Sequence, residues 1–380
     1  MNNNKNIYKE SNINIPTSFF SFNLFKKVNY TTHFEQGKQN RAKKFLNYNK
    51  SLTIKNIRNS MVHYILYFSI IISIIPSLIY SAGTTSKIII KIDKSGTQKI
   101  FSDKYTGGDP NTIRVNNNVK ILSNVRTIYL DSITNNIELI WNAPLENTSY
   151  MFYNISQITE VDLSNVYTEQ LTNISNMFST CTGITSINLQ NFKTHKVTNM
   201  VSLFAGCISL KSIDVSGFDT SKVVWIHYMF FKCASFTSLY VSNFGTSSVR
   251  DMSSMFSNCY SLTTLDISNF HVSQVYSTGH MFDSCINLVS LNLSNFKTPL
   301  ILYWDNMFKN CTNLAYINLI NAVEYLDGKS YNLANILLDT IDNMVFCIKN
   351  SSIPKILKEM EKKFVKYTVA SKIGKVSKKK

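Results

Sequence analysis

The sequence predicts an α/β solenoid of about seven repeats, each 26 residues long. Three observations support this fold class: a residue pair that returns at a fixed interval, a helix-like apolar spacing in the first half of each repeat, and a strand-like alternation in the second half. A fixed period of this length is typical of repeats that bury their apolar faces only against their neighbours. The pair is Met-Phe, with one Leu-Phe, and it begins at Met151, Met177, Leu203, Met229, Met255, Met281 and Met307.

The first half of the repeat has the apolar spacing of a short helix. In the copy that spans residues 197–218, apolar side chains lie at Met200, Leu203, Phe204 and Cys207. This i, i+3, i+4, i+7 pattern is one face of an α-helix of about two turns. We therefore expect a row of short helices along one side of the solenoid.

The second half of the repeat alternates with period two. In the same copy Ile213 and Val215 alternate with polar residues, as they would in a short strand with one buried face. A recurrent Phe, often preceded by Asn, then marks the turn that ends the strand. The repeats should thus place short parallel strands on one face and short helices on the other. Equivalent alternations lie at Ile187/Leu189, Leu239/Val241, Leu265/Ile267, Leu291/Leu293 and Ile317/Leu319.

The repeat resembles a known family of surface proteins. Leu262-x-x-Leu265-x-Ile267 has the spacing of leucine-rich repeats. The fuller pattern M-F-x-x-C-x-x-L-x-x-L-D-[LI]-S-N-F resembles the BspA-like leucine-rich-repeat surface proteins, including mycoplasma-type surface lipoproteins, over residues 145–325. The resemblance implies a secreted or surface-attached adhesin that interacts with a host. The best-matching copy contains Met255, Phe256, Cys259, Leu262, Leu265, Asp266, Ile267, Ser268, Asn269 and Phe270.

The net charge of +16 does not indicate nucleic-acid binding, because it lies at the two ends of the chain. Residues 1–60 hold 11 Lys/Arg and two Glu, and residues 346–380 hold 11 Lys and two Glu, while the stretch between them has a net charge of −2. A phosphate-binding surface needs Lys and Arg clustered on the folded domain. The repeat body is close to neutral, so we expect no nucleic-acid partner.

Residues 61–82 have the layout of an export signal. The uncharged stretch 64–80 follows basic Lys55 and Arg58 and precedes the small residues Ser81-Ala82-Gly83. Two interpretations remain open: translation begins at Met61 and the signal peptide is cleaved, or the segment is a transmembrane signal anchor with a basic cytoplasmic tail. Both place the repeats outside the cytoplasm, in the extracellular space or on the cell surface.

The rest of the chain divides by composition. Residues 1–60 are rich in Asn and Lys without a period, so we expect them to be disordered or not translated. Residues 83–145 contain strand-like runs and should cap the N-terminal end of the solenoid, which we place at 146–325. Residues 326–380 are expected to form a C-terminal cap and a basic tail, with a helical face at 353–365.

Six cysteines follow the 26-residue period, four positions after each Met or its Leu replacement. The first repeat has Ile155 in this position, which favours a small, buried, apolar role over a chemical one. Adjacent thiols lie near disulfide reach, so both free thiols and disulfides between repeats remain open, with free thiols preferred. Because the sequence contains no C-x-x-C and its histidines are not spaced with the cysteines, no metal site is expected. The six are Cys181, Cys207, Cys233, Cys259, Cys285 and Cys311.

The outward strand positions are the candidate ligand-binding face. They form three polar columns, and the large side chain of Tyr240 makes it the expected anchor of a partner. The alternative is that these columns only solubilise the sheet. Alternate aspartates would lie roughly 10 Å apart, too far for one calcium ion. The central column consists of Asp162, Asn188, Asp214, Tyr240, Asp266, Asn292 and Asn318.

These observations favour a binding protein over an enzyme. We expect an exported repeat protein that adheres to a protein of a host or neighbouring cell, without a cofactor. One alternative is a self-associating structural coat protein, and a weaker one is an enzyme with its site in residues 83–145. Catalytic motifs such as G-x-S-x-G, H-E-x-x-H and the phosphate-binding loop are absent from the sequence.

Overall fold

The computed structural model describes residues 85–120, 126–297, 300–321, 332–342 and 344–347. The chain divides into two units, Met1–Ile75 and Pro76–Lys380, and every described residue lies in the second. The predictions for residues 1–60, for the export segment 61–82 and for a helix at 353–365 fall outside the described residues. Within the described part, no helix has the length and apolarity needed to cross a membrane.

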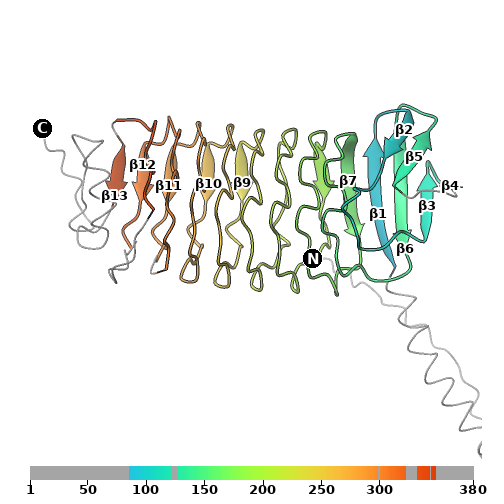
Figure 1. Ribbon diagram of the computed structural model, residues 1–380, viewed down its shortest axis with the longest axis horizontal. Coiled ribbons are helices and arrows are strands. Elements are labelled where there is room, and N and C mark those ends of the chain that lie inside the picture. Colours follow the sequence, from blue (N-terminus) through green and yellow to red (C-terminus); the bar gives the residue numbers. More distant parts are fainter. Residues whose placement is uncertain (1–84, 121–125, 298–299, 322–331, 343, 348–380) are drawn as a thin grey trace, which may run out of the picture. The chain divides into compact units, whose positions relative to one another are not determined.

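Residues 86–141 form antiparallel strands that join the first turn of the solenoid. β6 lies between β1 and β3, and β1 also pairs antiparallel with β7 of the first turn (Figure 1). The sheet order is β4-β3-β6-β1-β7-β8, and β2 pairs separately with β5. The strands of this N-terminal region are β1 Ser86–Ile92, β2 Gly96–Lys99, β3 Thr112–Val115, β4 Asn118–Lys120, β5 Thr127–Leu130 and β6 Asn135–Trp141.

Beyond β7 the chain winds into a β-solenoid of about seven 26-residue turns, and each turn lies beside the next (Figure 1). Most turns contribute one short parallel strand to a common face, which we call the sheet face. Parallel pairs join β7 to β8, β9 to β10, and β11 to β12 to β13. These strands are β7 Ile158–Asn165, β8 Ser186–Asn188, β9 Ser238–Tyr240, β10 Thr264–Asp266, β11 Ser290–Asn292, β12 Tyr316–Asn318 and β13 Val345–Cys347.

The predicted helices are wrong: the described residues contain none, so the fold is a β-solenoid rather than an α/β leucine-rich-repeat solenoid. Each Met-Phe segment is instead a run of tight turns. In the second repeat Asn176 and Thr180 have φ of 56° and 59°, and left-handed residues interrupt an α-helix. Along this segment, successive backbone N–H groups donate alternately to a carbonyl of their own turn and to a carbonyl of the next turn. The Met177 N–H donates within its own turn to Ile174, whereas the Phe178 N–H donates to Leu203 of the next turn.

The same two left-handed positions recur in every turn, four residues apart. We call the side of the solenoid that these segments form the turn face. A second parallel ladder of single bridges runs along it from Asn147 to Asn332. The left-handed residues are Tyr150/Asn154, Asn176/Thr180, Ser202/Gly206, Tyr228/Lys232, Ser254/Asn258, His280/Ser284, Asn306/Asn310 and Asn335/Asp339.

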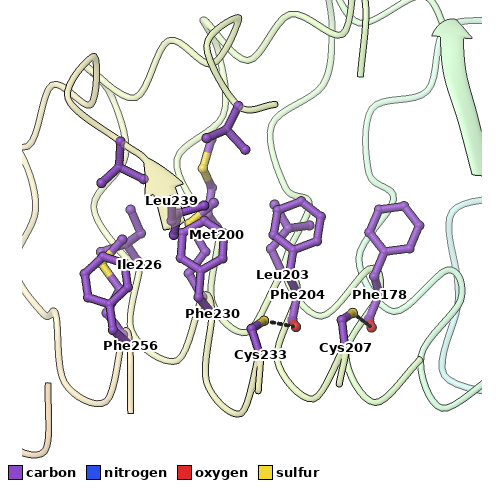
Figure 2. Close-up of a cluster of buried hydrophobic side chains, with 14 of the residues drawn as sticks. Phe178, Met200, Leu203, Phe204, Cys207, Ile226, Phe230, Cys233, Leu239 and Phe256 are labelled. Atoms are coloured by element: carbon purple, nitrogen blue, oxygen red, sulfur yellow. Dashed lines mark hydrogen bonds between the residues drawn. The ribbon is translucent and has the colours of Figure 1, made fainter. Parts of the chain in front are cut away.

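A row of stacked phenylalanine rings runs through the core. Phe178, Phe204, Phe230 and Phe256 lie in one row, with neighbouring centroids 5.7–5.8 Å apart and nearly parallel rings (Figure 2). This offset stacking adds to the hydrophobic gain from burial. The row continues into the N-terminal region, where the ring of Phe101, just after β2, lies 6.1 Å from that of Phe152.

The sheet face is interrupted in the third turn. Residues 212–214 were predicted to be a strand, but they form none, and Ile213 is only half-buried. In neighbouring turns a Thr precedes the strand, and the hydroxyls of Thr185 and Thr263 each donate to a carbonyl of the preceding turn at 3.1 Å. Lys211 takes this position in the third turn. Lys211 has no hydroxyl to make this bond.

The stacking continues past the last 26-residue copy. Tyr303 forms a bridge with Asn332, an interval of 29 residues, and the Phe308 N–H donates to the Ile336 carbonyl at 3.0 Å. Ile336 and Leu337 therefore occupy the places of Met and Phe in this longer turn. This turn cannot be found by looking for Met-Phe at 26-residue intervals, because both the residues and the interval differ.

Candidate ligand-binding face

The central column of the sheet face has a structural role at six of its seven predicted positions. The N–H of Ser268 donates to Oδ1 of Asp266 at 3.0 Å, and this bond to the residue two positions earlier closes a small turn at the end of β10. Six of the seven predicted residues accept such a bond, at 2.8–3.2 Å. The six are Asp162, Asn188, Asp214, Asp266, Asn292 and Asn318.

Some members of this column also bond to each other along the solenoid. The Asn188 amide donates to Oδ1 of Asp162 at 3.0 Å, and the Asn318 amide donates to Oδ1 of Asn292 at 3.1 Å. Hydrogen bonds from Ser216 and Ser268, led by those of their side chains, lower the pKa of Asp214 and Asp266. The carboxylates therefore stay ionised at neutral pH while they hold the backbone in place.

Tyr240 departs from this arrangement. Its side chain cannot close the turn that Asp and Asn close, and it is 77% exposed, the highest value among the large apolar residues of the described chain. A depression beside it is lined by Ser238, Thr264, Asp266 and Ser290, among others. A large exposed ring over a shallow depression is typical of an anchor for a binding partner.

A second depression lies where the sheet face meets the N-terminal strands. Its lining includes Lys91, Glu160, Asp162 and Asn188. The Lys91 ammonium lies 2.7 Å from the Glu160 carboxylate, and this hydrogen bond raises the pKa of Lys91. Asp162 and Asn188 of the predicted column thus lie in one depression, whereas Tyr240, Asp266 and Asn292 line the other.

The cysteine column lies in the core. Each thiol donates to the carbonyl of a Phe in the preceding turn at 2.8–3.2 Å, as Figure 2 shows for Cys207 and Cys233. Burial raises the pKa of Cys181, Cys259 and Cys311 to about 12. The cysteines of the described residues are unpaired. No group of three His, Cys, Asp or Glu side chains within the described ranges is arranged to hold a metal ion.

Sequence reasoning missed two structural columns outside the sheet face. Buried threonines at Thr194, Thr220 and Thr246 each donate to a carbonyl of the next turn, at 2.9–3.2 Å. On the turn face, Asn173 accepts a bond from the N–H two residues later, like the column of the sheet face. The 26-residue recurrence of Thr and of Asn or Asp was the signal that could have revealed both.

The comparison with known families matches the repeats. Residues 146–240 and 237–323 match the family described as Mycoplasma protein of unknown function, DUF285. The matched ranges cover less than half of the 380-residue chain. No curated protein matches the sequence. Together, the DUF285 match and the solenoid fit a mycoplasma-type repeat surface protein; the finer resemblance to BspA-like proteins is not established by the match.

Proposed function

We propose that this protein is exported and binds a protein of a host or neighbouring cell through its sheet face. The main support for the proposal is that Tyr240 differs from the other residues of the central column of the sheet face. Six positions accept backbone hydrogen bonds that close small turns, whereas Tyr240 is exposed above a depression. Solenoids commonly bind through such extended faces, and exposed aromatic residues contribute much of the binding energy at interfaces.

Three further considerations support the proposal. The DUF285 match fits a surface repeat protein. The resemblance of the repeat to BspA-like adhesins implies the same setting. The sequence 61–82 has the layout of an export signal, followed by a near-neutral repeat body. In this proposal the chain is a binding protein rather than an enzyme, and it needs no cofactor.

Binding to purified fibronectin, laminin and collagen tests the proposed face. Replacing Tyr240 with Ala should weaken saturable binding by about 30-fold, because truncation of an anchor residue costs about 2 kcal/mol. Surface plasmon resonance measures the change. Tyr129→Ala is the matched control, because Tyr129 is 65% exposed but lies in β5 of the N-terminal strands. Equal binding by both variants would exclude Tyr240 as the anchor.

A test of the Asp214 carboxylate in binding needs a substitution that keeps the turn intact. Asp214→Ala would remove the acceptor of the Ser216 N–H and disturb the turn, whereas Asp214→Asn keeps the acceptor and removes only the charge. Asn already occupies the same column at Asn188 and Asn292. Weaker binding by Asp214→Asn, with unchanged thermal stability, would assign the carboxylate to the interface.

Self-association is the second candidate function. Val289, Tyr316 and Val345 lie in consecutive turns at one end of the sheet face, and 38–51% of each is exposed. Apolar side chains grouped in this way favour contact with another protein surface. If the chain binds none of the matrix proteins and sediments as an oligomer whose size grows with concentration, the coat-protein function replaces adhesion.

Export is tested separately. N-terminal sequencing of the mature protein from its native cell distinguishes cleavage near Ala82 from an uncleaved anchor. Recovery of an intact chain from the cytoplasmic fraction would contradict export in both forms.

A further inference from the structure

Two aromatic pairs occupy the same two columns of the turn face, three turns apart. Tyr150 and Tyr153 pack edge to face with ring centroids 5.5 Å apart, and Tyr228 and Phe231 do the same at 5.4 Å. A lysine ammonium lies over one ring of each pair. The Lys104 ammonium lies 4.2 Å from the centroid of the Tyr153 ring, and the Lys232 ammonium lies 5.1 Å from that of Phe231.

Only small side chains separate the two pairs. The turns between them place Asn176 and Ser202 in the first column, and Ser179 and Ala205 in the second. The two pairs should lie about 14 Å apart, since stacked strands are about 4.8 Å apart. The result is a trough with an aromatic wall at each end. A depression in it is lined by Ser179, Thr180, Ser202, Ala205, Gly206, Tyr228, Phe231 and Lys232.

Gly206 lowers the floor of this trough. It takes a left-handed position, with φ of 75°, that holds a longer side chain in other turns. A Cβ at this position would lie 3.3 Å from the Cα of Thr180, so the backbone packs closely on the preceding turn. The floor next to Lys232 therefore has no side chain of its own.

The backbone of the trough is already hydrogen-bonded. The N–H groups of Thr180, Ser202 and Gly206 donate to carbonyls of the following turn at 2.6–3.1 Å. An extended peptide recognises a strand through free main-chain groups, so this floor cannot pair with one. Recognition must come from the aromatic rings, the hydroxyls of Ser179 and Ser202, and the two ammonium groups.

The charge of the trough favours an anion. In the described part of the chain, neither Lys104 nor Lys232 lies within ion-pair distance of a carboxylate; both instead contact aromatic rings. A lysine ammonium that makes no ion pair is available to a ligand carboxylate or sulfate, and such charge-assisted hydrogen bonds are the strong ones. The rings offer flat apolar faces, and the serines offer donors and acceptors.

We propose that this trough binds a short anionic oligosaccharide. A sugar ring has an apolar C–H face that packs on Tyr228 or Phe231, hydroxyls that bond to Ser179 and Ser202, and, in an acidic sugar, a carboxylate or sulfate for Lys232. The site lies on the turn face and does not depend on the function proposed for the sheet face.

Calorimetric titration of the full chain tests the proposal. The probes are a hyaluronan tetrasaccharide and a chondroitin sulfate tetrasaccharide, with neutral chitotetraose for comparison. At least one anionic probe should bind saturably, and more than about tenfold more tightly than chitotetraose, because the ion pairs are lost with the neutral sugar. Absence of anionic binding overturns the proposal, and so does equally tight binding of a short poly-glutamate peptide.

Two variants test whether the oligosaccharide binds in the trough. Ser202→Tyr with Ala205→Phe fills the trough with the residues that its own columns hold at Tyr228 and Phe231, and Ser202 already has a φ close to that of Tyr228. This variant should fold and bind at least about tenfold more weakly, and Lys232→Gln should weaken binding by about tenfold. Lys309→Gln, in the Phe231 column three turns away, is the matched control and should bind normally.

Thermal unfolding and circular dichroism establish that each variant is folded. A folded double variant that binds the tetrasaccharide as tightly as the unaltered chain overturns the proposal. Tyr240→Ala should leave oligosaccharide binding unchanged. This distinguishes failure of the trough from failure of the sheet face.

Discussion

At the scale of single residues, the most regular positions are structural. The Met-Phe and Cys side chains are buried, and the Asp and Asn residues of the sheet face accept backbone hydrogen bonds. Regular recurrence follows from the need to repeat a packing solution in each turn. Candidate binding residues are therefore those that break a column, such as Tyr240 on the sheet face or Tyr228 and Phe231 on the turn face.

The buried thiols make stability depend on pH in the alkaline range. Burial raises the pKa of Cys181 to about 12 and holds that of Cys233 well above its ordinary value, whereas an unfolded thiol titrates near pH 8.5. A raised folded-state pKa stabilises the fold below the unfolded value. This stabilisation is lost as the pH rises from about 8.5 toward 12.

We therefore expect the urea midpoint to fall between about pH 8 and about pH 10. The fall should be smaller in a variant with Cys233→Ala and Cys259→Ala, because fewer buried thiols then titrate. Native thiols should also resist iodoacetamide below pH 8 and react in urea. An identical pH dependence in the variant would contradict this assignment.

At the scale of elements, the same apolar spacing serves two structures. The positions Ile174, Met177, Phe178 and Cys181 fit a helix, yet they line a series of turns. The distinguishing information lies at the two left-handed positions, where Asn and Ser are common. Tyr150 and Lys232 also occupy them, so composition gives only a weak signal. The period, the solenoid and the strand alternation of most turns could be predicted from the apolar spacing. The predicted helices were wrong, because the same spacing also fits a series of turns.

A substitution at a left-handed position tests this account. Ser284 has φ of 61°, and a β-branched residue is unfavourable there, so Ser284→Val should destabilise the fold by about 1–2 kcal/mol. Ser284→Gly should destabilise less than Ser284→Val, because both variants lose the hydroxyl that accepts from Asn310 and donates to Asp283, whereas Gly adopts this conformation readily. Chemical denaturation measures both. Ser290→Val, in β11, is the control and should be close to neutral. Equal effects of the two Val substitutions would exclude backbone strain as the cause.

The sheet-face site could be predicted only in part. Alternation indicates which side chains point outward, so the central column was found in the sequence. Its hydrogen-bonding role was not predicted, although the repeated Asp-x-Ser is a known turn pattern. The trough of the turn face could not be predicted, because placing Lys104 on Tyr153 requires the path of the chain between the N-terminal strands and the first turn.

At the scale of the whole solenoid, each turn is stabilised mainly by its neighbours, so the first turn depends on the N-terminal strands. Phe101 continues the phenylalanine row by packing on Phe152, and β1 pairs with β7. Without this cover the end of the core would face water. A solenoid with an exposed end is prone to associate with other apolar surfaces.

Removing the Phe101 ring should therefore have two effects. Phe101→Ala should cost about 3–5 kcal/mol, as for other buried aromatic residues. It should also expose the Phe152 ring and cause association that increases with protein concentration. Light scattering and thermal unfolding measure the two effects. Phe244→Ala, in a separate aromatic row, is the control that should destabilise without association.

The direction of the hydrogen bonds between turns has a mechanical consequence. The Phe178 N–H donates to Leu203 and the Phe204 N–H donates to Met229, so these bonds point along the stack rather than across it. A force that pulls the two ends of the stack apart would load the bonds of one boundary at a time. Each released turn would add roughly 90 Å of chain at about 3.4 Å per residue. Under tension the solenoid would lengthen in steps of nearly equal length as one turn after another separates from an end.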